Sequence, residues 1–313
     1  MADILKKYLF ENRTVKVQAL HLEQTWRDAQ AHQTYPPAVQ RILGELAAAS
    51  ALLAANLKFD GSLVLQLQGD GAVSLIVVEC RADLSLRATV KLRNDRVVPD
   101  NGTLRTLVNP GGTGRFIVVL DPSRKVPGQQ AYQGIVPIER DAVADVLQDY
   151  MAASEQLDTR LVLAADSERA AGLLIQRLPG TGGHHDAAVT PAGEADISVQ
   201  TYEHASVLAD TVKPEELLAA DVDTLIHRLF WDDTLLAFEP QTVRWYCSCS
   251  RERIADMLRM LGAGEVDDIL AEQGEVKVNC EFCGKPYVFD PVDCAGLFTQ
   301  GNALPEQDPP TRH

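Results

Sequence analysis

The sequence predicts an α+β fold, because strand-like segments occur in runs and the helical segments are separate from them. Residues 62–68 and 73–80 have the composition of strands, and the Gly-Asp-Gly turn at 69–71 between them is typical of a β-hairpin. Residues 37–57 and 143–151 carry apolar side chains at helical spacing instead. We therefore expect an N-terminal α+β domain with an antiparallel sheet.

Four regions are expected along the chain. Further short strands are predicted at 13–22, 86–92, 115–120, 133–136, 159–163 and 173–178. The glycine-rich run 179–183 then favours a boundary, and short acidic helices are expected at 214–219 and 222–230. The regions are an N-terminal domain (1–180), a helical acidic linker of marginal stability (181–241), a small C-terminal domain (242–300) and a disordered tail (301–313).

The amino-acid composition and charge argue against several classes of protein. Hydrophobic residues make up 46% of 313 residues, which allows a sizeable core and argues against global disorder. The net charge is −15, and residues 181–241 alone contribute −10, so nucleic acid is a poor partner for this half. The first residues lack the apolar core of a signal peptide, and no apolar run reaches the roughly 18 residues of a membrane span. We expect a cytoplasmic protein that does not bind membranes.

Four of the six cysteines form two close pairs. Cys247 and Cys249 are separated by one residue, Cys280 and Cys283 by two, and thirty residues lie between the pairs. Four thiolates complete a tetrahedral zinc shell at roughly 2.3 Å per bond, and such a closed shell is structural rather than hydrolytic. Clustered cysteines in a reducing compartment more often bind metal than form disulfides. The sequence therefore predicts a zinc site made by these four residues.

The residues around the pairs support this prediction. Ser250 can cap a helix that ends at Gly262, and a second short helix stops at Gly274. Residues 276–278 and 287–289 then alternate as two strands, which places the second cysteine pair at the tip of a hairpin. If the metal leaves, each pair could close as a local disulfide, although the Cys-x-Cys ring is tight. A module of about sixty residues has a marginal core, so metal loss should unfold it.

At these positions the chain closely resembles the thirty-three-kilodalton heat-shock chaperone family, the redox-regulated holdases of bacteria. The similarity covers about residues 5 to 298, and Asp158 departs from it where proline is expected in many members. The segments that carry the resemblance are Cys-Ser-Cys-Ser-Arg-Glu-Arg at 247–253, Cys-Glu-Phe-Cys at 280–283, and upstream 57–61, 69–71, 132–136, 154–156 and 225–230.

The resemblance implies a function. The reduced protein would hold one Zn²⁺ per chain and be inactive. Oxidation would form the disulfides Cys247–Cys249 and Cys280–Cys283, release zinc, unfold the linker and the C-terminal domain, and produce a homodimer. Residues 1–180 would serve client binding and dimerisation. The oxidised protein would bind unfolding clients without ATP under oxidative stress and pass them to ATP-dependent chaperones. The family is not enzymatic, and no catalytic residue is expected.

Two other functions are weighed against the holdase. A thiol–disulfide oxidoreductase could use Cys280 and Cys283, but that chemistry favours a strand-to-helix turn in a βαβ context. A zinc ribbon that binds nucleic acid is disfavoured by the −4 charge of residues 242–300. Of the other candidate ligands, Cys80 is expected to be a buried apolar residue and Cys294 a bystander thiol. His184 and His185 are expected to be solvated.

Overall fold

The computed structural model describes residues 3–124, 131–179 and 192–299. The chain divides into two compact units, Met1–Tyr246 and Cys247–His313. The second unit thus starts five residues later than the domain start expected at residue 242, because the intervening segment pairs with strands of the first unit. His184, His185 and the tail 301–313 lie outside the described residues.

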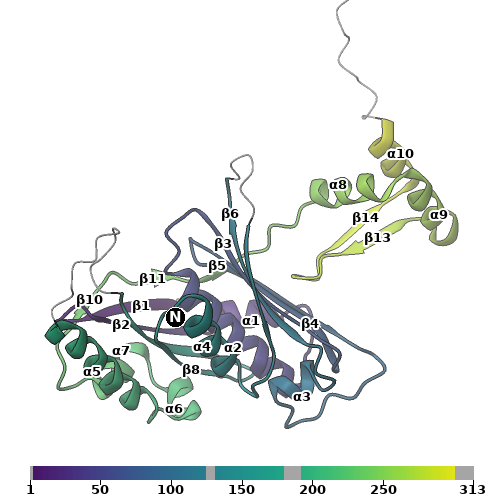
Figure 1. Ribbon diagram of the computed structural model, residues 1–313. Helices are drawn as coiled ribbons and strands as arrows, with labels where there is room; N and C mark the ends of the chain where they lie inside the picture. The colour runs from purple at the N-terminus through teal and green to yellow at the C-terminus, as the bar shows by residue number, and fades with distance from the viewer. Residues whose placement is uncertain (1–2, 125–130, 180–191, 300–313) are drawn as a thin grey trace, which may run out of the picture. The chain divides into compact units, whose positions relative to one another are not determined.

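Two sheets form the first unit, each with six strands in the described part of the chain (Figure 1). The first sheet has the order β10-β1-β2-β9-β8, with β11 also on β1, and the second has the order β12-β5-β4-β3-β6-β7. Their bounds are β1 Ile4–Phe10, β2 Val15–Leu22, β8 Thr159–Ala165, β9 Ala170–Arg177, β10 Leu235–Ala237, β11 Gln241–Thr242; and β3 Gly61–Gln68, β4 Val73–Arg81, β5 Ser85–Leu92, β6 Arg115–Pro122, β7 Tyr132–Pro137, β12 Arg244–Trp245.

Strand pairing is antiparallel in both sheets except between β12 and β5, which run parallel. The hairpin expected at Gly69–Gly71 joins β3 to β4, with Gln68 opposite Leu75. The α+β class is therefore confirmed, but the N-terminal part contains two sheets where the sequence suggested one.

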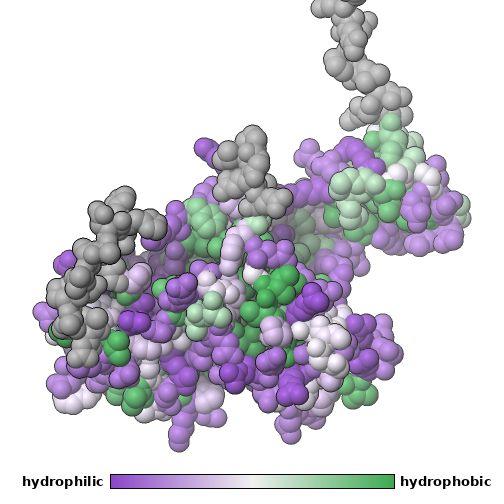
Figure 2. All heavy atoms as spheres, in the orientation of Figure 1, coloured by the Kyte–Doolittle hydropathy of each residue, from purple (hydrophilic) through white to green (hydrophobic). Residues whose placement is uncertain are grey.

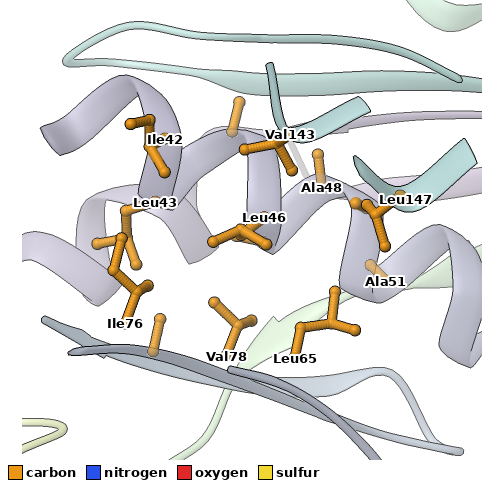
Figure 3. Packing of buried hydrophobic residues seen from close by; sticks show 14 of the residues in the cluster. Ile42, Leu43, Leu46, Ala48, Ala51, Leu65, Ile76, Val78, Val143 and Leu147 are labelled. Atoms are coloured by element: carbon orange, nitrogen blue, oxygen red, sulfur yellow. The ribbon is translucent and has the colours of Figure 1, made fainter. Parts of the chain in front are cut away.

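A central helix lies between the two sheets. The helices of this unit are α1 Gln24–Gln30, α2 Pro37–Ala54, α3 Leu104–Val108, α4 Val143–Ser154, α5 Ala192–Ala209, α6 Pro214–Ala219 and α7 Val222–Leu229. Helix α2 contacts β8 and β9 of one sheet and β3 and β4 of the other. Figure 3 shows its Leu46 facing Val78 of the second sheet, with Leu147 of α4 near the same core. Gly44 allows this packing, since a Cβ there would lie 2.4 Å from the Cβ of Ala165.

The helices of the expected linker cover the outer face of the first sheet (Figure 1). Leu217 and Leu225 are buried there, and the Phe10 and Phe230 rings meet edge-on with centroids 5.6 Å apart. Lys6 Nζ of β1 lies 2.5 Å from Asp223 Oδ2 of α7. The acidic segment and the first sheet therefore share a second apolar cluster, which is separate from the core around α2.

The second unit is a small helix-and-hairpin module. It contains α8 Arg251–Leu261, α9 Ala263–Gln273, β13 Val276–Asn279, β14 Pro286–Phe289 and α10 Pro291–Thr299. Strands β13 and β14 are antiparallel, with Asn279 opposite Pro286. Its core is a cluster of eight buried residues, among them Leu258, Val266 and Phe289. This core is small, as expected for a module of this size.

Most expected elements are present, and eight of the elements in the described residues were not anticipated. The sequence analysis proposed no element at β1, β10, β11, β12, α1, α3, α5 and α10, and α5 spans 18 residues. Helix α5 buries Ala205 and Ala209 rather than large apolar residues, so its periodic signal is weak. Polar residues cover most of the visible surface of the first unit, with smaller apolar patches between them (Figure 2). Within the described ranges, no helix combines the length and apolarity needed to cross a membrane.

The packing of α2 leads to a prediction. Leu46 is 0% exposed, so Leu46→Ala should destabilise the first unit by about 3 kcal/mol through lost burial and a residual cavity. Urea unfolding followed by tryptophan fluorescence reports on this unit, since all three tryptophans lie in it. Val97→Ala, at a side chain 89% exposed, is the control and should change stability by less than about 0.5 kcal/mol. Equal effects of the two substitutions would contradict the assigned core.

Candidate metal centre

Two turns of the second unit supply the four paired cysteines. Cys247 and Cys249 precede α8, whose first turn is capped by Ser250: its Oγ accepts a hydrogen bond from the Arg253 amide at 3.2 Å. Cys280 and Cys283 lie in the turn between β13 and β14. The expected helix cap and the hairpin position of the second pair are both confirmed.

The turn at the second pair is closed by backbone hydrogen bonds. The Cys280 amide donates to the Lys285 carbonyl at 3.0 Å, and the Gly284 amide donates to the Cys280 carbonyl at 2.8 Å. Gly284 has φ +68°, a left-handed conformation that a residue with a Cβ adopts at a cost. This geometry brings the chain back on itself directly after Cys283, so that both thiols face the other pair.

The four sulfur atoms form one cluster. All four Sγ atoms lie within 4.8 Å of one another, and this is the only such group of metal-ligating side chains among the described residues. Cys247 Sγ is 3.5 Å from Cys280 Sγ, and Cys249 Sγ is 3.4 Å from Cys283 Sγ. Four sulfurs about 2.3 Å from a tetrahedral zinc ion would be about 3.8 Å apart. The donor set and spacing therefore fit a tetrahedral metal ion, and all four cysteines are free thiols.

A tyrosine hydroxyl acts directly on this cluster. Tyr287 of β14 donates from its hydroxyl to Cys249 Sγ at 3.1 Å. Burial raises the pKa of the Cys249 thiol, but the Tyr287 hydrogen bond and the neighbouring thiols outweigh it and lower the pKa to about 7. Burial instead raises the pKa of Cys247 and of Cys283. One sulfur of the cluster thus carries thiolate character near neutral pH, the form that binds metal and reacts with oxidants.

An arginine ties three elements of the module together beside the sulfurs. Arg251 of α8 donates to the Val288 carbonyl at 2.7 Å and to Asp293 Oδ2 of α10 at 2.6 Å. Its guanidinium carbon lies 4.2 Å from the centroid of the Phe289 ring. The sequence analysis assigned no contact to Arg251 or to Tyr287. Their contacts depend on the strand register, although the alternation of Tyr287 and Phe289 indicates that both face inward.

The remaining cysteines lie away from the cluster. Cys80 is 0% exposed in the core of the first unit, which confirms the expectation of a buried apolar residue. Cys294 is 2% exposed and packs in the core of the second unit. Burial raises the pKa of both thiols, so neither is a reactive thiolate.

The position of the Cys-x-x-Cys motif bears on the alternative functions. It lies between two short antiparallel strands, whereas a thioredoxin-like site lies where a strand leads into a helix. The nearby Cys247 and Cys249 further distinguish it from a simple dithiol. Both observations weigh against the oxidoreductase.

Comparisons with known proteins agree over nearly the whole chain. Residues 3–290 match a family model described as Hsp33 protein. A 33 kDa chaperonin of Chromobacterium violaceum is 44% identical over 296 residues, which are 95% of this chain and 94% of the relative. One of Methylobacillus flagellatus is 44% identical over 309 residues, 98% of each chain. The crystal structure of the 33 kDa chaperonin of Thermotoga maritima matches with a TM-score of 0.76 at 18% identity, covering 95% of this chain and 98% of that one.

The Arg251 contacts lead to a prediction. Arg251→Lys keeps the charge but loses the planar fork that contacts Val288, Asp293 and Phe289 together. We expect the second unit to lose about 1 kcal/mol of stability, measured by amide hydrogen exchange in β14. Glu252→Gln, at the next and exposed position, should leave exchange unchanged. Unaltered protection in the lysine variant would show that the arginine does not hold these elements together.

Proposed function

The chain belongs to the Hsp33 family, and we propose on this premise that it is a redox-regulated, ATP-independent holdase. The observation that carries the proposal is the convergence of four thiol sulfurs within 4.8 Å, from two segments thirty residues apart. The small core beneath them would depend on a bound ion for its stability.

In the reduced state, Cys247, Cys249, Cys280 and Cys283 would hold one zinc ion per chain. The bound ion would supply structural cross-linking rather than hydrolytic chemistry, because four sulfurs leave no open coordination position. Tyr287 would support the thiolate form of Cys249 through its hydroxyl. The Arg251 contacts would hold α8 and β14 in the geometry that keeps the two turns together.

Oxidation would operate on the cysteine pairs. In each pair, two thiolates would transfer two electrons to hypochlorous acid, which takes up one proton and leaves as chloride and water while one S–S bond forms. The products would be the disulfides Cys247–Cys249 and Cys280–Cys283, with two oxidant molecules consumed per chain. Disulfide sulfurs no longer offer the thiolate ligands that zinc requires, so the ion would leave and the second unit would unfold.

The linker helices would connect this event to client binding. Helices α5–α7 cover the outer face of the first sheet, and their release would expose the apolar cluster that they share with it. Trp231 and Phe238, 73% and 54% exposed, already present apolar surface beside these helices. Unfolding proteins would bind such surface, and the oxidised chains would associate as a homodimer. Clients would later pass to ATP-dependent chaperones, and the protein would act in the cytoplasm during oxidative stress.

The first test follows zinc and chaperone activity together. The reduced protein should contain one zinc per chain and should not prevent the thermal aggregation of a client protein. After treatment with hypochlorous acid it should release the zinc and suppress aggregation without ATP. Equal protection before and after oxidation would refute the switch, and catalytic turnover of a disulfide substrate would favour the oxidoreductase instead.

A second test separates the cluster from the other thiols. Cys283→Ser removes one of the four ligands, so zinc affinity should fall by more than about tenfold and the reduced second unit should be less stable. Chelator competition and thermal unfolding measure the two effects. Cys294→Ala is the matched control, since it removes a buried thiol of the same unit outside the cluster. Zinc affinity of the serine variant equal to wild type would show that the ligands are assigned wrongly.

A further inference from the structure

A group of lysines lies on the face of the first sheet that packs against α2. Lys7 of β1 is directly opposite Gln18 of β2. Lys16, two residues before Gln18 on β2, is opposite Leu9 of β1. Side chains two apart on a strand share a face, so Lys7, Lys16 and Gln18 lie on the same face as Leu5 and Leu20. Both leucines are 0% exposed in the core around α2. Two cations and an amide thus share a face with buried leucines.

The group has no acidic partner in the described part of the chain. No ion pair is formed by Lys7, Lys16 or Lys58 with those residues. Burial, followed by the charges of Lys7 and Lys58, lowers the pKa of Lys16 to about 8. Lys7 donates to the Ala55 carbonyl at the end of α2, where the helix dipole offers a partial negative charge. Lys16 has no such partner among the hydrogen bonds of the described residues, and Lys58, in the segment that follows α2, is exposed.

A buried amide donor beside these lysines is also unused. Asn56 Nδ2 donates both to the Leu52 carbonyl at 3.0 Å and to Gln18 Oε1 at 2.9 Å. Since a backbone carbonyl only accepts, the Asn56 atom is the nitrogen, and the Gln18 atom facing it must be the oxygen. Gln18 Nε2 is therefore the remaining atom; it is buried without a partner, and the residue is 0% exposed. Leaving such a donor unpaired is destabilising.

We propose that Lys7, Lys16, Lys58 and Gln18 form a binding site for a phosphate group. The three ammonium groups and the free Nε2 of Gln18 are all donors, and each needs an acceptor. The three positive charges have no acidic partner among the described residues, which matches a dianion better than a carboxylate with one charge. The site is independent of the cysteine cluster, since it lies in the first unit and the cysteines lie in the second.

The test measures phosphate binding by the full-length reduced protein. At pH 7 and matched ionic strength, replacing chloride by inorganic phosphate should raise the unfolding temperature seen by tryptophan fluorescence, by about 5 °C at a hundred times the dissociation constant. Isothermal titration gives the affinity. Lys16→Gln should weaken it about tenfold or more, whereas Lys91→Gln, at an exposed lysine of the other sheet, should not. No phosphate effect beyond chloride, or an unchanged affinity in Lys16→Gln, would overturn the site.

A second variant replaces the negative charge of the phosphate by a carboxylate of the protein itself. Gln18→Glu should raise the unfolding temperature in chloride, because the carboxylate pairs with the lysines, and should abolish the phosphate effect. A Gln18→Glu protein that is less stable in chloride and still responds to phosphate would also overturn the proposal. Titration with tripolyphosphate distinguishes the source of the group: tighter binding than orthophosphate indicates the end of a phosphate polymer, and equal or weaker binding indicates the free ion.

Discussion

The convergence of two turns on one cluster of sulfurs is the constraint on which the second unit depends. The turns before α8 and between β13 and β14 are thirty residues apart, yet their thiols lie within 4.8 Å of one another. The core of this unit is a cluster of only eight buried residues among those described. Tyr287 of β14 and Arg251 at the start of α8 reinforce the arrangement through the contacts described above. Under the proposed mechanism, a change at the sulfurs alone would order or disorder this module.

Local patterns were sufficient to predict the parts of the fold whose signals are local. The hairpin of β3 and β4, the cap at Ser250 and the positions of the four cysteines all follow from short motifs. Strand β1 was missed because Lys6 and Lys7 interrupt its alternation, and its partners β10 and β11 follow more than 200 residues later. Helix α5 was missed because alanines make its contacts. The Tyr287–Cys249 hydrogen bond requires a known strand register, which the sequence does not display.

The acidic segment, residues 181–241, combines a high negative charge with buried apolar side chains. Among its described residues, Asp223 pairs with Lys6, while Leu217, Leu225 and Phe230 are buried in the cluster that they share with the first sheet. The cluster is separate from the core around α2, so the segment could detach without opening that core. This separation supports the proposed role of α5–α7 as a releasable cover.

The pairing of β1 also affects the order in which the chain can fold during synthesis. One edge of β1 is closed by β2 soon after both leave the ribosome, but the other edge is closed by Leu235–Ala237 and Gln241–Thr242. Most of the chain must therefore be synthesised before this edge of β1 is covered. An open strand edge is a template for pairing with other chains. The nascent protein thus carries for a time the kind of aggregation hazard that the finished protein is proposed to control in others.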